Sequence, residues 1–86
     1  MSSNGYSVFV GNLPYRATED DLGHYFSQAG NVNNVRIVYD RQTNRAKGFG
    51  FIEFSDEKSS QNAVNQLNGT EFQGRTLRVN LANQRQ

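Results

Sequence analysis

Phenylalanine side chains in a short glycine-rich stretch are the first residues in the chain whose spacing indicates a binding surface. Residues 47–54 read KGFGFIEF and hold three of the six phenylalanines of this 86-residue chain. Successive residues of a β-strand point to opposite sides, so Phe49 and Phe51 would share one face with Lys47. A half-buried strand normally turns its large apolar side chains inward. Two rings beside a lysine therefore raise the question of which face meets the core.

Bond-making chemistry and metal binding have little support in the sequence. His24 is the single histidine, it stands between apolar positions of an expected helix, and the chain has no cysteine. Glu19, Asp20 and Asp21 are interpreted as favourable charges at the start of that helix. Because no nucleophile–base pair and no metal constellation is apparent, we expect no enzymatic activity, no metal and no cofactor.

The composition indicates a small single domain. A chain of this length buries only about 60 to 65% of its unfolded surface, and its formal net charge of +1 matches neither a basic arm nor an acidic tail. The absence of cysteine favours a reducing compartment. The N-terminal residues do not resemble a signal peptide, and no apolar run approaches the length of a membrane span. We therefore expect a protein that is not secreted and works in the nucleus or the cytoplasm.

Hydrophobic periodicity predicts four strands and two helices. The strands are expected at residues 7–12, 33–40, 47–54 and 76–80. The first helix is expected to begin at Thr18, a good capping residue, and to end at Gly30. Ser55 or Asp56 is expected to cap the second helix. The order β-α-β-β-α-β predicts an α+β ferredoxin-like sandwich, in which both helices cover one face of a four-stranded antiparallel sheet.

The cost of burying charge indicates which face of the sheet the helices cover. The apolar set of strand residues is Val8, Val10, Val35, Ile37, Gly48, Gly50, Ile52, Phe54, Leu77 and Val79. The opposite set is Phe9, Arg36, Val38, Lys47, Phe49, Phe51, Glu53, Arg78 and Asn80. Unpaired buried charges cost several kcal/mol each, so the apolar set must face the helices. Gly48 and Gly50 are expected to make room for them. The three rings Phe9, Phe49 and Phe51 are then left together on the open face, a pattern typical of a binding surface.

The stretch KGFGFIEF resembles the RNP1 motif of the RNA recognition motif (RRM) family at every position. The stretch VFVGNL, residues 8–13, is similar to the RNP2 motif of the same family. Together with the element order, the resemblance implies one RRM domain over residues 7–82, with short flexible ends at 1–6 and 83–86. It also implies that the open sheet face binds single-stranded RNA, or single-stranded DNA by the same chemistry, with two or three bases stacked on the aromatic residues.

The resemblance implies a role for each matching position. Phe9 and Phe51 would each stack under a base, Phe49 would lie against the sugars between two nucleotides, and Lys47 would pair with a phosphate. Beside the rings, the expected contacts are Arg36, Arg78 and Asn80. In the loops and the tail, the expected contacts are Tyr15, Arg41, Arg45, Ala82 and Asn83.

Three further residues have expectations of their own. Tyr39, at the end of a strand, is expected to pack rather than to bind. Asn44 stands where the family commonly has a glycine, and asparagine tolerates the positive φ that the turn needs. Glu53 is expected to pair with a neighbouring arginine.

A protein-binding surface is the alternative function. Some RRM relatives cover the same sheet face with a partner helix or a second copy, often after losing the aromatic residues of RNP1 and RNP2. All three rings are present here, which favours RNA. We expect a monomer that acts in mRNA processing or regulation, with room for protein partners in a ribonucleoprotein particle and no contact with membranes.

Overall fold

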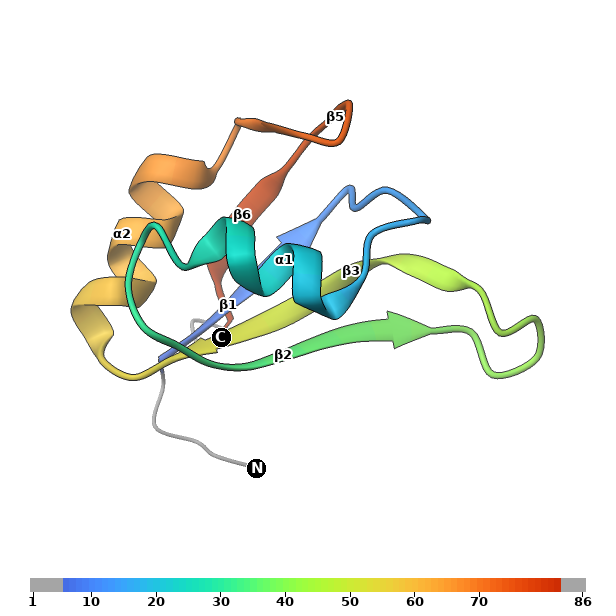
Figure 1. Cartoon of the computed structure of the whole chain (residues 1–86), viewed down its shortest axis with the longest axis horizontal. Coiled ribbons are helices and arrows are strands. Elements are labelled where there is room, and N and C mark those ends of the chain that lie inside the picture. Colours follow the sequence, from blue (N-terminus) through green and yellow to red (C-terminus); the bar gives the residue numbers. More distant parts are fainter. Residues whose placement is uncertain (1–5, 83–86) are drawn as a thin grey trace.

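Two helices and a four-stranded sheet form the body of the protein, whose computed structural model describes residues 6–82. The elements are β1 (Ser7–Gly11), α1 (Glu19–Phe26), β2 (Val32–Tyr39), β3 (Ala46–Phe54), α2 (Glu57–Leu67), β4 (Glu71–Phe72), β5 (Arg75–Thr76) and β6 (Arg78–Leu81). The main sheet has the antiparallel order β2-β3-β1-β6 (Figure 1). The predicted α+β sandwich is therefore confirmed.

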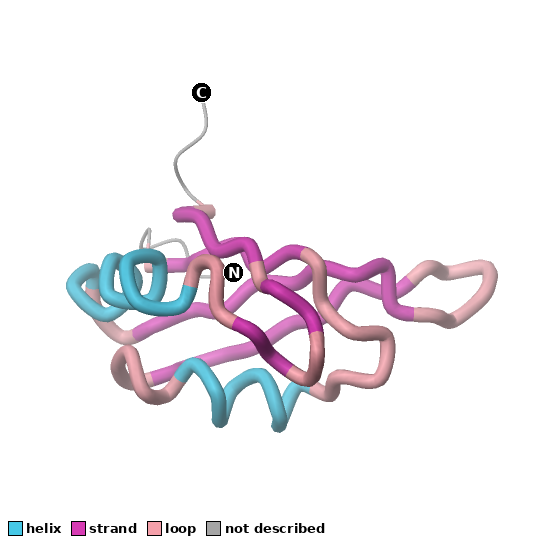
Figure 2. The backbone as a smooth tube through the Cα atoms, turned by 90° about the horizontal axis from the view of Figure 1, so that it is seen from above, coloured by secondary structure: helices cyan, strands magenta, loops and turns pink. Residues whose placement is uncertain are grey.

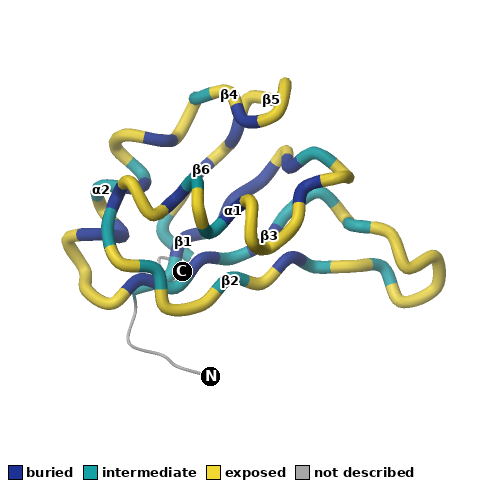
Figure 3. Tube along the Cα trace, viewed as in Figure 1, coloured by how far each residue is buried: buried dark blue, intermediate teal, exposed yellow. Residues whose placement is uncertain are grey.

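Both helices pack against the apolar face of the sheet. Helix α1 contacts β2, and α2 contacts β1, β3 and β6; Figure 2 shows α1 running along one side of the sheet. Val8, Val10 and Val79 are fully buried beneath the helices, together with Leu22 and Phe26 of α1. Figure 3 shows buried segments along both the strands and the helices. The apolar set faces inward, as the cost of burying charge predicts.

Helix α1 begins where the sequence indicates and ends earlier. The Thr18 hydroxyl accepts a hydrogen bond from Asp21 N at 3.0 Å, and Asp21 Oδ2 accepts one from Thr18 N at 3.4 Å, which together form a capping box. The helix ends at Phe26, so the expected end at Gly30 is wrong. A Cβ at Gly30 would overlap the Ser59 side chain, so this glycine allows the turn after α1 to approach α2.

Hydrogen bonds at both helix starts lower the pKa of an aspartate. The side-chain hydrogen bond from Gln73 is the main reason for the lowered pKa of Asp21, and the bonds with Thr18 add to it. Asp56, one of the two expected caps of α2, accepts a hydrogen bond from Ser59 N at 2.9 Å. Hydrogen bonds from Ser59 lower the pKa of Asp56 in the same way, because they favour the ionised carboxylate.

A small hairpin precedes the last strand of the main sheet. The strand expected at 76–80 is found as β6 at Arg78–Leu81, and before it β4 and β5 pair with each other through two residues each. Phe72 of β4 is buried, and its ring lies 4.9 Å from the ring of Tyr25, centroid to centroid. The hairpin was not predicted, because two-residue strands leave no alternation to detect.

The two glycines of KGFGFIEF do not make room for the helices, so this expectation is wrong. Gly50 is buried, and a Cβ there would lie 2.5 Å from the Arg36 carbonyl oxygen of β2. Gly48 has φ +95°, and a Cβ there would meet nothing within 4 Å. Gly50 therefore permits a close approach of two strands, whereas Gly48 permits a backbone conformation that other residues avoid.

Side chains from outside the sheet bond to both of its edge strands. At the β2 edge, Ile37 N donates to Glu19 Oε2 of α1 at 3.0 Å. At the β6 edge, Val79 N donates to Asn68 Oδ1 at 2.9 Å. Glu19 therefore does more than place a charge at the start of a helix, because it also satisfies a backbone group of the strand beside it.

Candidate nucleic-acid interface

Three aromatic rings stand together on the sheet face opposite the helices; we call Phe9, Phe49 and Phe51 the ring platform. Phe9 of β1 pairs with Phe51 of β3 in register, and their ring centroids are 5.8 Å apart. Phe49 lies 5.7 Å from Phe9 and 6.3 Å from Phe51. Each of the three is partly buried. These distances are typical of contacting aromatic pairs, so the rings support one another while part of each remains accessible.

A glycine on β1 gives one ring its space. Gly11 pairs with Phe49, and a Cβ at Gly11 would approach the Phe9 ring to 3.0 Å. Sequence reasoning did not single out Gly11 as part of the site. The available signal was its position on the same strand, two residues after Phe9 and on the same face.

The platform continues into a row of side chains that crosses all four strands; we call it the central row. It consists of Arg36 on β2, Phe51 on β3, Phe9 on β1 and Asn80 on β6, each paired with the next in register. The Arg36 guanidinium carbon lies over the Phe51 ring, 5.8 Å from its centroid. Arg36 and Asn80 are exposed at the two ends of the row. The arrangement offers a positive charge at one edge, flat rings in the middle and an amide at the other edge.

Two more predicted cations lie close to the platform. Arg78 of β6 pairs with Gly11 in register and is exposed. Lys47 lies two residues before Phe49 on β3 and is also exposed. Both side chains are therefore accessible to an anion.

The loop between β2 and β3 holds the predicted residues Arg41 and Arg45, both exposed. It projects beyond the rest of the sheet (Figure 1). Asp40 shapes it, because its Oδ1 accepts from Gln42 N at 2.8 Å and its backbone N donates to the Arg45 carbonyl at 2.8 Å. Asn44 has φ 63°, so the positive φ expected there is confirmed.

The remaining predicted residues lie at the margins of the face. Tyr15, in the loop after β1, is 72% exposed. Ala82 N donates to the Ser7 carbonyl at 2.9 Å, which continues the pairing of β6 with β1 by one residue. Asn83 lies outside the described residues. Tyr39 is 48% exposed, so it is not a core residue, and its expected packing role stays a prediction.

Glu53 lies on the same face, one step along β3 from the platform. Its cross-strand neighbours are Ser7 on β1 and Asn34 on β2, neither of which is charged. The guanidinium of Arg36, the arginine diagonal to Glu53 by register, lies over the Phe51 ring instead. The arginine neighbour expected for Glu53 is thus not found beside it in register.

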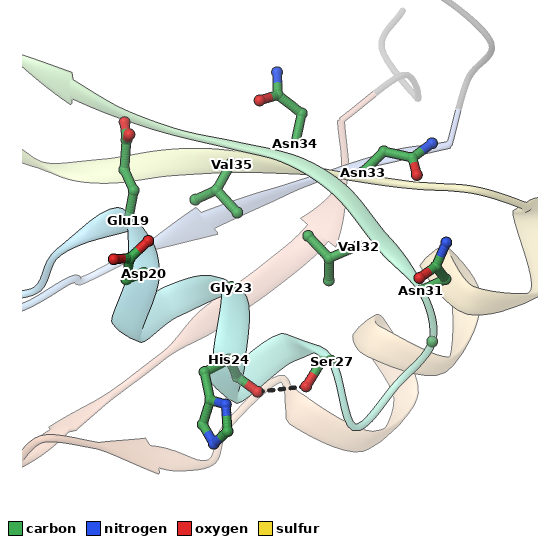
Figure 4. Close-up of a pocket in the computed structure, with 11 residues that line it drawn as sticks. Glu19, Asp20, Gly23, His24, Ser27, Asn31, Val32, Asn33, Asn34 and Val35 are labelled. Carbon is green, nitrogen blue, oxygen red and sulfur yellow. Dashed lines mark hydrogen bonds between the residues drawn. The ribbon is translucent and has the colours of Figure 1, made fainter.

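A concave surface lies away from the rings, between α1 and β2. This groove of about 840 Å³ is lined by residues of α1, of β2 and of the turn that joins them (Figure 4). Glu19 and Asp20 give its α1 wall a negative charge, and Ser27 Oγ donates to the His24 carbonyl at 2.7 Å. The groove suits a polyanion poorly. Within residues 6–82, no group of three or more potential ligands is placed to hold a metal ion, and no helix is long and apolar enough to cross a membrane.

Comparison with known proteins agrees with this geometry. The family model of the RNA recognition motif matches residues 8–78. The chain belongs to the RNA recognition motif family. Among solved structures, this RRM superposes on the RNA15 RRM with bound RNA (GU) with a TM-score of 0.81 and 38% sequence identity, covering 92% of this chain and 84% of the other.

Two of the relatives are much longer than this chain. Over 76 residues, this RRM is 53% identical to the cleavage stimulation factor subunit 2 tau variant of Homo sapiens. The aligned region covers 88% of this chain and 12% of the relative. Over 85 residues, it is 45% identical to the glycine-rich RNA-binding protein 10 of Brassica napus. This alignment covers 99% of this chain and 50% of the relative. The chain therefore spans about an eighth of the first relative and half of the second.

Proposed function

We propose that the ring platform binds single-stranded RNA. One base stacks on Phe9 and another on Phe51, while Phe49 lies against the sugars between them. Stacking of a base on an aromatic side chain stabilises a complex by roughly 1 to 3 kcal/mol. The observation that supports this proposal most is the central row, which places two adjacent rings at the middle of a face that neither α1 nor α2, the helices of residues 6–82, covers.

The cations around the platform provide the phosphate contacts in this proposal. Arg36, Lys47 and Arg78 are exposed on the sheet, and Arg41 and Arg45 extend the charge along the projecting loop. Asn80, Tyr15, Ala82 and Asn83 contribute contacts at the edge of the face. Phosphate contacts orient the strand and add affinity, whereas the sheet-face and backbone groups read the bases.

Similarity supports a role in mRNA processing for the protein that contains this domain. The human relative is named as a cleavage stimulation factor subunit, and the solved relative was determined with GU RNA. We propose a monomeric RRM over residues 7–82 that binds RNA in the nucleus, works beside protein partners and performs no catalysis of its own.

The first test is the dependence of binding on salt. If three or four basic groups neutralise phosphates, the logarithm of the association constant for a short uridine-rich RNA should fall against the logarithm of the salt concentration with a slope of about −2 to −3. Fluorescence anisotropy at several salt concentrations measures this slope. An affinity that does not change with salt would contradict the proposal.

Removal of two rings is the second part of the same test. The double variant Phe9→Ala/Phe51→Ala should bind the same RNA at least about 30-fold more weakly, because two stacking contacts are lost. Circular dichroism must show that the variant is folded, which is expected because both rings lie outside the buried core. Unchanged RNA binding by the folded variant would favour the protein-binding alternative, and a partner that the variant no longer captures would then identify it.

A further inference from the structure

One acidic residue on the ring-bearing face has no evident use in stacking or in phosphate binding. Among the strand residues that the structure describes on this face, Glu53 is the only carboxylate, and it is partly buried. It follows Phe51 on the same strand and the same face. A negative charge beside a binding site for a polyanion opposes binding, so its position there requires an explanation.

A carboxylate can contact RNA favourably only through hydrogen-bond donors. Ionised Glu accepts and does not donate, so phosphate oxygens are excluded as partners. The Watson–Crick edge of guanine carries two neighbouring donors, N1–H and N2–H, at a spacing that the two oxygens of one carboxylate match. Bidentate pairs of this type are among the stronger and more selective hydrogen bonds. Uracil offers a single N3–H on that edge.

The neighbours of Glu53 complete the same recognition pattern. Asn34 and Ser7 flank it in register on β2 and β1, and each carries a donor that suits the guanine O6 next to N1–H. Successive residues on one face of a strand are roughly 6.6 Å apart, twice the rise per residue. The edge of a base near the Phe51 ring therefore reaches Glu53 without leaving the sheet.

We infer that Glu53 selects guanine at one position of the bound RNA, by accepting hydrogen bonds from N1–H and N2–H while Asn34 or Ser7 donates to O6. The inference rests on the proposed function, because it places the base on the same face as the ring platform. It assigns Glu53 to base recognition instead of the arginine pair expected from the sequence.

The test uses a series of RNAs that are seven nucleotides long and otherwise consist of uridine. Each carries one guanosine at a different position, and a matched series carries inosine, which lacks only the N2 amino group. We expect one position at which the wild-type protein binds the guanosine RNA about tenfold more tightly than the inosine RNA. The variant Glu53→Gln should bring this ratio close to one, because an amide replaces one acceptor oxygen with a donor.

The matched control is Glu71→Gln, which removes one exposed carboxylate on β4 and changes the net charge by the same amount. It should leave the ratio unchanged. The inference is overturned if Glu53→Gln tightens binding to every RNA by one common factor and keeps the guanosine preference, because Glu53 then acts only by repulsion. Wild-type binding to uridine RNA without any guanosine preference overturns the inference alone. Failure of the wild-type protein to bind any of these RNAs overturns the proposed function as well.

Discussion

Arg36 is the member of the central row whose contribution can be separated from stacking. Its guanidinium lies over the Phe51 ring at 5.8 Å, a geometry in which a cation is attracted to the face of the ring. A base that stacks on Phe51 must share or displace this contact. In the proposed complex, the Arg36 guanidinium then pairs with a phosphate of the RNA.

We predict that Arg36→Met lowers RNA affinity several-fold and makes the salt slope less negative by about 0.7, the value for one phosphate contact to a single strand. Methionine keeps the apolar stem against the ring and removes the charge. Binding curves at several salt concentrations measure both effects. The matched control is Lys58→Met on α2, an exposed residue of the helix layer, which should leave the slope unchanged. Equal changes in the two variants would mean that net charge alone is responsible.

The sequence alone was enough to predict which aromatic residues form the site. The positions of Phe9, Phe49 and Phe51 follow from the two-residue period of strands and from the cost of burying the charges that share their face. The surroundings of Glu53 could not be predicted in this way. Its neighbours depend on the register of β1 and β2 against β3. A shift of one residue in either pairing would have placed other residues beside Glu53.

At the scale of elements, β3 is tied closely to β2 at Gly50. The Arg36 carbonyl oxygen lies 2.5 Å from where the Cβ of a side chain at Gly50 would lie. The same two-strand unit extends beyond the sheet as the projecting loop (Figure 1). The stability of this unit therefore depends on one glycine more than on the other.

We predict that Gly50→Ala lowers the free energy of unfolding by about 3 kcal/mol, the upper end for inserting a methyl group into a packed site. Gly48→Ala is the matched control. Its added methyl group meets no atom within 4 Å, so its cost of about 1 kcal/mol comes only from the positive φ. Urea unfolding of both variants measures the difference. A larger loss in Gly48→Ala would show that strand packing at Gly50 is not the limiting feature.

Elements with a long periodic pattern were predictable, and short elements were not. The capping box at Thr18 and the four main strands follow local rules, apart from shifts of one or two residues at most of their ends. The β4–β5 hairpin instead depends on a distant contact, since Phe72 packs on Tyr25 of α1. Helix α1 ends at Phe26, although the apolar residue Ala29 follows at the helical spacing. The chain turns toward α2 instead, where Gly30 lies against Ser59.

At the scale of the whole molecule, the two helix caps determine part of the response to acid. The pKa values of Asp21 and Asp56 are lowered in the folded protein. A lowered pKa means that the unfolded chain takes up protons first as the pH falls. The stabilisation is therefore complete above the pKa of an unfolded aspartate, about 3.9, and is lost as the pH falls through the lower folded value.

We predict that the melting temperature stays level from neutral pH to about pH 5 and falls below about pH 4. The double variant Asp21→Asn/Asp56→Asn should begin with a lower melting temperature and lose less of it in acid, because two of the titrating groups are gone. Thermal melts between pH 2 and pH 7 measure this. Parallel pH profiles for the two proteins would show that other carboxylates control the acid response.

The hydrogen bonds at the two sheet edges have a consequence for the behaviour of many copies together. An open edge strand is a template on which another chain can add a strand, and this is a common route to aggregation. Here a carboxylate oxygen of Glu19 occupies the Ile37 N–H of one edge, and the Asn68 amide oxygen occupies the Val79 N–H of the other. Each oxygen stands where the carbonyl of an incoming strand would have to bind. When copies of this domain crowd along one RNA, these two oxygens therefore oppose strand addition at the positions that they occupy.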